Sequence, residues 1–169
     1  MGKTSLALRS VDAARRHGLE VLIYDPRLSP VWGRVALLTD DIDRLGRVAL
    51  AQDWQRRPAT VRCLVVVDEA GFDEQLARPV LTRLATQYRH HGHSVLAIAH
   101  YYKQMPPAVR TGAADTLYLY QQGIDQARQA AQDWNRPELV GAVDLEQGEA
   151  LKATRDCRKV VKLRNLCPC

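Results

Sequence analysis

The sequence predicts an α/β protein with a mostly parallel sheet flanked by helices. Segments with apolar residues at helical spacing alternate with short apolar runs that are typical of buried strands. Strands that are apolar on both faces occur chiefly in parallel sheets, because helices cover both faces of such sheets. The chain has 169 residues, which is enough for one domain with a substantial core.

The first half of the chain predicts alternating helices and strands. Apolar spacing predicts a helix from Thr4 to His17, and Gly18 is a typical C-terminal stop. The run LEVLIYDP predicts a strand halted at Pro26, and RVALLTD predicts a second strand. The run DDIDRLGRVALAQDWQRR predicts a helix with acidic residues first and basic residues last. The run VRCLVVVDEAG then predicts a strand that ends in two carboxylates.

The second half continues the alternation and ends differently. A single apolar stripe predicts a helix between Phe72 and His91, and a second stripe predicts a helix over Ile124–Trp134. Between them, SVLAIAH and DTLYLYQ predict strands on either side of a Pro-Pro loop. The run GAVDLEQGEALKAT predicts an antiparallel hairpin that turns at Gln147-Gly148. We therefore expect an α/β domain in residues 1–150 and a basic edge strand or tail in residues 151–169.

Composition and charge limit the functional classes. Apolar residues make up 46% of the chain, and no apolar run approaches the ~20 residues that span a bilayer. The N-terminus lacks a secretory signal, so we expect a cytoplasmic protein without a membrane segment. From residue 151 onward, one acidic residue stands against six basic residues: Lys152, Arg155, Arg158, Lys159, Lys162 and Arg164. Such a segment suits a polyanion such as nucleic acid, and a solvated tail explains it equally well.

The opening run MGKTSLAL contains the end of a phosphate-binding loop. Gly2-Lys3-Thr4 matches the last three positions of G-x-x-x-x-G-K-[ST], and a helix follows. Backbone N–H groups at such a helix N-terminus bind phosphate oxygens, and the helix dipole favours their charge. We expect Lys3 to contact the β- and γ-phosphates of ATP, Thr4 to ligate Mg²⁺, and Ser5 to help at the α-phosphate.

A second motif, LVVVDEA, supplies two carboxylates. Four apolar residues place Asp68 at the carboxyl end of a predicted central strand, where it can hold Mg²⁺ through water. Glu69 points elsewhere and can orient or deprotonate an attacking water. A simple strand terminus is the alternative for this motif alone. Together with the Gly-Lys-Thr triplet, it indicates binding of ATP and Mg²⁺.

The first strand and the start of the phosphate-binding loop are missing from the sequence. We expect Met1 to be an internal methionine or the start of a fragment, and a genuine but degraded relative of such a protein is the alternative. The absent strand is expected to leave an unfilled place beside the strand at residues 63–67, with unpaired edges inside the sheet. The chain as numbered is expected to hydrolyse ATP weakly or not at all.

From Gly2 to Gln122, the motifs resemble those of FtsK/HerA-type P-loop ATPases in order and kind. They are most similar to viral genome-packaging ATPases and to Zot-like assembly ATPases of filamentous phages. The segment VLAIAHYYKQMPPAVRTGAADTLYLYQQ is the most discriminating part. The resemblance implies a γ-phosphate sensor at His100, where the family commonly has glutamine. It also implies an arginine that a neighbouring subunit supplies in trans, for which Arg89 is the best match and Arg83 and Arg110 are alternatives.

The resemblance further implies an ATPase that couples hydrolysis to translocation of double-stranded DNA, most specifically in viral genome packaging. It implies a ring homo-oligomer, expected to be a hexamer, with capsid or portal components as further partners. The expected location is the host cytoplasm or the virion. A Zot-like assembly ATPase is the first alternative, and a non-catalytic nucleotide- or DNA-binding module is the second.

Four further groups have two interpretations each. Asp25 lines the nucleotide or pore side, or it forms a turn before Pro26. The run Tyr101-Tyr102-Lys103 contacts single strands, or it packs in a loop. His90, His91 and His93 suggest metal binding less well than a solvated helix end. Among the cysteines, Cys63 is expected to be a small buried residue, and metal binding by Cys157, Cys167 and Cys169 is a minor alternative.

Overall fold

The computed structural model describes residues 3–51, 63–70, 74–88 and 92–164. The chain forms two compact units, which we describe separately. The parallel-sheet unit is Ala7–His100, and the hairpin unit is Met1–Leu6 with Tyr101–Cys169. The division into residues 1–150 and 151–169 stays a prediction.

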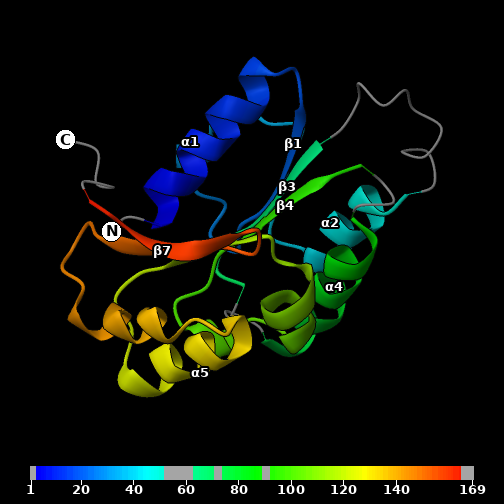
Figure 1. Ribbon diagram of the computed structural model, residues 1–169. Helices are drawn as coiled ribbons and strands as arrows, with labels where there is room; N and C mark the ends of the chain where they lie inside the picture. Colours follow the sequence, from blue (N-terminus) through cyan, green and yellow to red (C-terminus); the bar gives the residue numbers. More distant parts are fainter. Residues whose placement is uncertain (1–2, 52–62, 71–73, 89–91, 165–169) are drawn as a thin grey trace. The chain divides into compact units, whose positions relative to one another are not determined.

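The described elements (Figure 1) are α1 (Lys3–Arg16), β1 (Glu20–Tyr24), η1 (Pro30–Trp32), β2 (Leu37–Thr39), α2 (Ile42–Ala49), β3 (Cys63–Val67), α4 (Glu74–Gln87), β4 (Ser94–Ala97), η2 (Tyr102–Gln104), η3 (Ala108–Ala113), β5 (Thr116–Leu119), α5 (Ile124–Trp134), η4 (Pro137–Asp144), β6 (Ala150–Thr154) and β7 (Cys157–Leu163).

A four-stranded parallel sheet in the order β2-β1-β3-β4 forms the centre of the parallel-sheet unit. All five residues of β3 are buried, as expected for an apolar strand between two neighbours. The prediction of an unfilled place beside this strand is wrong. Strand β1 pairs with β3 on one side and β4 pairs with it on the other, so both edges of β3 are occupied.

Helix α1 buries one stripe on the sheet. Ala7, Val11 and Ala14 follow each other at spacings of four and three residues and pack in a core cluster with residues of β1 and β3. Gly18 adopts a φ of 72°, and its N–H donates to the carbonyl of Arg15, which ends the helix as the sequence predicts. The chain then reverses into β1. In Figure 1, α1 lies on one side of the sheet, and α2 and α4 lie on the other.

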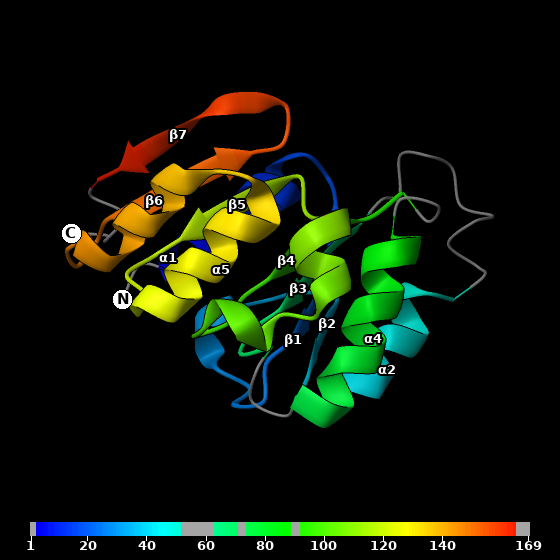
Figure 2. The ribbon, with the colours of Figure 1, turned by 60° about the horizontal axis from the view of Figure 1, so that its bottom comes forward.

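Helices α2 and α4 pack against each other on the other face of the sheet (Figure 2). Asp41 caps α2, because its Oδ1 accepts a hydrogen bond from the N–H of Arg44 at 2.9 Å. The two helices approach closely at Gly46, where a Cβ atom would lie 2.9 Å from Cγ1 of Val80. Glycine therefore permits the contact between these helices.

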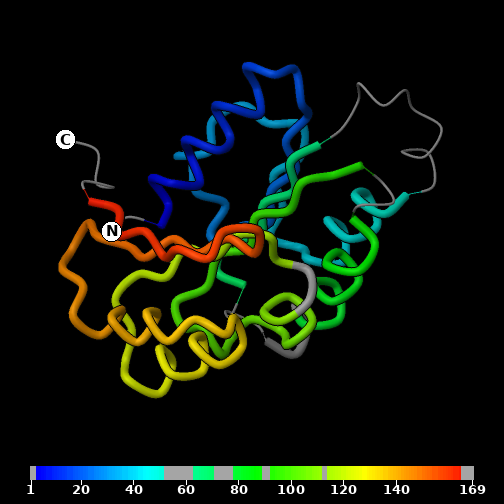
Figure 3. The backbone as a smooth tube through the Cα atoms, viewed as in Figure 1, coloured from blue at the N-terminus to red at the C-terminus, as the bar shows by residue number. Residues whose placement is uncertain are grey.

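The hairpin unit contains an antiparallel sheet in the order β5-β6-β7. Helix α5 covers one face of it, because Ala127, Ala130 and Trp134 share a buried cluster with Leu119 and Leu151 (Figure 2). The hairpin itself connects β6 to β7 and turns at residues 155–156 (Figure 3). The sheet is thus a second sheet, where the sequence indicated an edge added to the first.

The predicted position of the hairpin turn, Gln147-Gly148, is wrong. Residues 137–144 form the 3₁₀-helix η4 rather than a strand, and β6 begins only after the Gln147-Gly148 turn. Pro137 has the fixed φ that suits the first turn of a helix, and Leu139 and Ala142 are both fully buried. Their spacing of three residues matches the 3₁₀ period, which explains the difference.

Among the described residues, no helix combines the length and the apolar character that crossing a membrane requires.

Candidate functional site

Polar side chains follow three neighbouring strands of the parallel sheet. Asp25 follows β1, Asp68 and Glu69 follow β3, and His100 comes shortly after β4. Because these strands are parallel neighbours, the four residues belong to the same edge of the sheet. Ligands of open α/β sheets bind outside the carboxyl ends of the strands. This edge is therefore the candidate site of the parallel-sheet unit.

The main chain holds Asp68 and Glu69 between the two neighbouring strands. The N–H of Asp68 donates to the carbonyl of Tyr24 at 2.9 Å, and the N–H of Ala70 donates to the carbonyl of Ile98 at 2.8 Å. Between these bonds, Glu69 has a φ of 47°, a conformation that residues other than glycine seldom adopt. Such strain costs about 1–3 kcal/mol and is concentrated at functional sites. The two carboxylates are thus held on a rigid turn.

The carboxylate of Glu69 lies between two basic side chains. Its Oε1 is 3.1 Å from a guanidinium nitrogen of Arg27 and 3.8 Å from Nε2 of His100. The side chain of Glu69 is 17% exposed, whereas those of Arg27 and His100 are 72% and 64% exposed. The structure therefore brings Glu69 and His100 together, and their catalytic roles stay predictions. Sequence reasoning missed Arg27.

Asp68 has a carboxyl group whose ionised form is disfavoured. Burial raises its pKa above the usual value, and the nearby charges of Asp25 and Glu69 add to this effect. The N–H of Glu69, which donates to Oδ1 of Asp68 at 2.9 Å, and the nearby His100 act in the opposite direction. A cation at this position would offset the crowding of negative charge.

The residues at this edge fit one Mg²⁺ ligand rather than a complete metal cage. Within the described part of the chain, no group of three or more His, Cys, Asp or Glu side chains is arranged to hold a metal. Mg²⁺ is usually bound by one or two carboxylates together with substrate phosphates and water. Asp68 can supply such a carboxylate, so its chemistry fits Mg²⁺ that arrives with a nucleotide.

Asp25 acts as the anchor of a turn. Its carboxylate is 2% exposed and accepts hydrogen bonds from the N–H groups of Arg27 at 2.8 Å and Ser29 at 2.9 Å. Its Oδ2 also accepts a hydrogen bond from Nε1 of the buried Trp32 at 2.7 Å. Of the two interpretations from the sequence, the turn before Pro26 is therefore the one that the structure supports.

The residues of the phosphate-binding motif begin helix α1. Lys3 is the first residue of this helix, and Thr4 and Ser5 follow in its first turn. Thr4 is exposed, and the first turn of α1 contains no acidic residue. A helix N-terminus of this kind favours an anion. These residues belong to the hairpin unit, and Gly2 lies outside the described residues.

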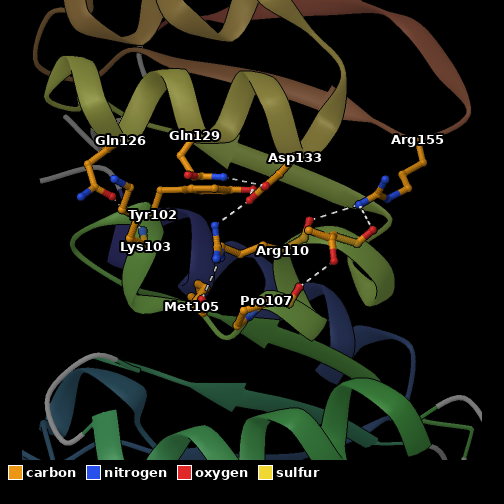
Figure 4. A network of polar contacts seen from close by, with 10 residues as sticks. Tyr102, Lys103, Met105, Pro107, Arg110, Gln126, Gln129, Asp133 and Arg155 are labelled. Carbon is orange, nitrogen blue, oxygen red and sulfur yellow. Dashed lines mark hydrogen bonds and ion pairs between the residues drawn. The ribbon is translucent and has the colours of Figure 1, made fainter.

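The arginines proposed to act in trans have different surroundings. Arg89 lies outside the described residues, and Arg83 is exposed on α4. Arg110 contacts Asp133 at 2.6 Å, donates to the carbonyl of Met105 at 3.0 Å and lies over the ring of Tyr102 (Figure 4). Its side chain is only 14% exposed. Arg110 is thus engaged within its own chain, which disfavours it as an arginine for a neighbouring subunit.

The run Tyr101-Tyr102-Lys103 after β4 is partly packed and partly exposed, so each of the two interpretations from the sequence applies to part of it. Tyr102 is buried, and its hydroxyl donates to Asp133 at 3.1 Å, so this residue packs within the hairpin unit. Tyr101 is 59% exposed, and Lys103 is exposed too. Only these two side chains remain available for contact with a nucleic acid.

The histidine and cysteine candidates give no metal site within the described residues. His93 and Cys63 are both buried, and Sγ of Cys63 is 3.1 Å from Nδ1 of His93. The Nε2 of His93 lies 2.9 Å from the carbonyl of Ala49, which fixes the proton on this nitrogen because a carbonyl accepts. His90, His91, Cys167 and Cys169 lie outside the described residues.

Comparisons with known proteins reveal likeness in structure. No protein-family model and no curated protein sequence matches the chain. The genome-packaging NTPase B204 from Sulfolobus turreted icosahedral virus 2 with AMPPCP has a TM-score of 0.71, and its match has 13% sequence identity and covers 95% of this chain and 91% of B204. The same NTPase with AMP has a TM-score of 0.68 at 14% identity, with coverages of 89% and 85%.

A further match is B204 described as the DNA-packaging ATPase of Sulfolobus turreted icosahedral virus, with a TM-score of 0.71, 13% identity and coverages of 95% and 90%. At such identity, the likeness concerns the fold. It confirms the α/β architecture and the structural resemblance to viral packaging ATPases that the motifs indicated. The chain has the fold of the genome-packaging NTPase B204.

Proposed function

We propose that the chain binds and hydrolyses ATP with Mg²⁺ and works in viral genome packaging as a motor that translocates double-stranded DNA. The observation that carries the proposal is the Asp68–Glu69 pair, held on a strained turn at the carboxyl end of the central strand β3. Its support is the fold shared with an NTPase whose structures contain AMP and AMPPCP.

We assign the roles as the motifs suggest. Gly2, Lys3 and Ser5 contribute to phosphate binding, and Thr4 and Asp68 ligate Mg²⁺, which neutralises charge on the phosphates. Glu69 orients or deprotonates the attacking water, because its carboxylate lies at the strand end next to Asp68. His100 contacts the γ-phosphate; an imidazole can donate a hydrogen bond to phosphate.

The proposal includes a ring of identical subunits, most specifically a hexamer, with Arg89 supplied in trans. A positive charge next to the transferred phosphoryl group stabilises its transition state. Double-stranded DNA, capsid or portal components, and a location in the host cytoplasm or virion complete the proposal. Its DNA part is supported by B204, which is described as a DNA-packaging ATPase.

ATP hydrolysis by the purified chain tests the proposal. Mg²⁺-ATP turnover is measured with and without double-stranded DNA, together with binding of a fluorescent ATP analogue. We expect DNA to raise the rate and Glu69→Gln to abolish turnover while it leaves nucleotide binding intact, because the amide cannot accept the proton from water.

Glu138→Gln serves as the control, because Glu138 is exposed on η4, has no role in the proposed site, and loses the same charge in this replacement. It should retain the unmodified rate. A slow turnover that rises with double-stranded DNA would agree with the weak hydrolysis expected from the sequence. Nucleotide binding without any turnover would contradict a motor in this chain and favour the non-catalytic binding module. Absence of nucleotide binding would contradict both functions.

A further inference from the structure

We propose that Arg27 is a positioning residue that restrains the Glu69 carboxylate and thereby slows ATP hydrolysis until the ion pair opens. This inference rests on the proposed function, because it assigns a restraint to the group that would act on water. The observation behind it is the 3.1 Å contact between the Arg27 guanidinium and Oε1 of Glu69.

The turn after β1 is built to present Arg27 to the site. Asp25 accepts hydrogen bonds from the backbone of Arg27 and Ser29 and from the indole of Trp32, so it fixes both ends of the turn. Trp32 is 1% exposed and anchors the turn in the core. Leu28, directly after Arg27, has a φ of 48°, which is unusual for a residue with a branched side chain. These contacts fix the backbone of the turn and therefore the position of the Arg27 Cα and Cβ atoms next to the site.

The other side of the ion pair is also fixed through its backbone. The N–H of Glu69 donates to Asp68, and the next residue is bonded to the strand-end segment after β4. The carboxylate of Glu69 therefore starts from a defined position and can change direction only through its own side-chain torsions. Two rigid backbones facing each other make the contact a specific one.

The ion pair is weak enough to open during a catalytic cycle. Because the Arg27 side chain is 72% exposed, water screens its charge, and exposed pairs of this kind contribute little to stability. While the contact lasts, the guanidinium restrains the direction of the Glu69 carboxylate and lowers the basicity of its Oε1, which weakens the group as an acceptor for a proton from water. Removing Arg27 should therefore raise the rate of the reaction modestly, by about two- to fivefold.

The experiment compares three variants of the purified chain. Arg27→Ala should raise the DNA-independent kcat about two- to fivefold, and it should leave KM and the affinity for a fluorescent ATP analogue unchanged. Arg27→Lys should keep the low rate, since an ammonium group can also pair with the carboxylate. Arg47→Ala is the matched control, because Arg47 is 70% exposed and pairs with Asp41 on α2 at 3.5 Å. It should behave as the unmodified chain.

Three outcomes would overturn the restraint. They are a kcat of Arg27→Ala equal to or below that of the unmodified chain, a change in KM alone, or the same rise in Arg47→Ala. If the unmodified chain hydrolyses ATP and loses activity on Glu69→Gln, such a result contradicts only the role of Arg27. If neither the unmodified chain nor Arg27→Ala binds nucleotide, the proposed function fails and the inference about Arg27 fails with it.

Discussion

Burial decides the chemistry of single residues in this chain, and Cys63 shows this most clearly. Desolvation is the main cause that raises the pKa of its thiol to about 12, and the negative charge of Glu20 adds to it. The thiol therefore stays protonated far above the pH at which an exposed cysteine ionises, and His93 accepts its weak hydrogen bond.

The difference in burial between Cys63, which is buried, and Cys157, which is exposed, predicts that an alkylating reagent modifies the two cysteines selectively. With iodoacetamide at pH 8.5, Cys157 should react because it is exposed, and Cys63 should stay unmodified. Raising the pH to 9.5 should still leave Cys63 unmodified, because its raised pKa keeps the thiol protonated. Mass mapping of the peptides measures both sites, and denaturant should make Cys63 reactive. Rapid modification of Cys63 in the folded protein would contradict its burial.

The ion pair of Arg110 and Asp133 predicts a large loss of stability. Both side chains are nearly buried, at 14% and 11% exposure, so removing Arg110 leaves the buried Asp133 carboxylate without an opposite charge, held only by hydrogen bonds from Tyr102 and Gln129. Arg110→Ala should reduce the free energy of unfolding by about 3–5 kcal/mol, measured by denaturant titration. The exposed pair in Arg47→Ala should cost less than about 1 kcal/mol. Equal losses in the two variants would contradict this reasoning.

At the scale of elements, the contact between α2 and α4 depends on Gly46, which has no side chain. In most helices, alanine is more favourable than glycine by about 1 kcal/mol. At Gly46, however, a Cβ would meet Val80 at 2.9 Å, and overpacking costs about 1–3 kcal/mol. Gly46→Ala should therefore destabilise the protein by an amount on the order of 1 kcal/mol, measured by thermal unfolding.

Two variants check that the cause is this contact. Val80→Ala combined with Gly46→Ala should lose less than the sum of the single changes, because the smaller side chain makes room. Gly141→Ala, where nothing lies within 4 Å of the added Cβ, should cause no loss. Additive effects at Gly46 and Val80 would argue against the contact.

The elements themselves could be predicted from periodicity where the apolar pattern is regular. The helix at Lys3–Arg16 and the strand at Cys63–Val67 agree with the pattern to within a few residues. The segment 137–144 differs, because its apolar run over residues 139–143 resembles a short buried strand, while Pro137 and the spacing from Leu139 to Ala142 favour a 3₁₀ turn.

The candidate site could be predicted only in its local parts. Two carboxylates after an apolar run indicated Asp68 and Glu69, because this signal lies within one short segment. The partner Arg27 could not be found this way, since its contact depends on β1 lying next to β3 and on a turn anchored by Trp32. The shared site of Lys3 with Asp68 stays a prediction.

At the scale of the whole molecule, the excess positive charge is concentrated in residues 151–169, and three of its six basic residues lie on the last strand, β7. Arg158 and Lys159 are exposed on β7, and no ion-pair partner for them occurs within the described ranges. Lys162 and Arg164, in contrast, pair with Glu149 at 2.7 and 3.5 Å. The two pairs of basic residues therefore differ in how freely they can meet phosphates.

We expect Arg158 and Lys159 to contact DNA phosphates. Each such contact steepens the dependence of log K on log salt by about 0.9 for double-stranded DNA. Replacing both by alanine should therefore reduce the slope by about 1.8, measured by fluorescence anisotropy at several salt concentrations. The double replacement of Arg44 and Arg47, both exposed on α2, removes the same charge elsewhere and should leave the slope unchanged. Equal effects would point to net charge alone.

Strand β7 forms the end of its sheet and presents a row of backbone groups on its outer edge. An edge of this length is a template for pairing with strands of other molecules, which leads to aggregation. The lysines and arginine along β7 would lose hydration and repel their own copies in such a pairing. The same charges that suit a polyanion thus keep concentrated copies of the protein from joining edge to edge.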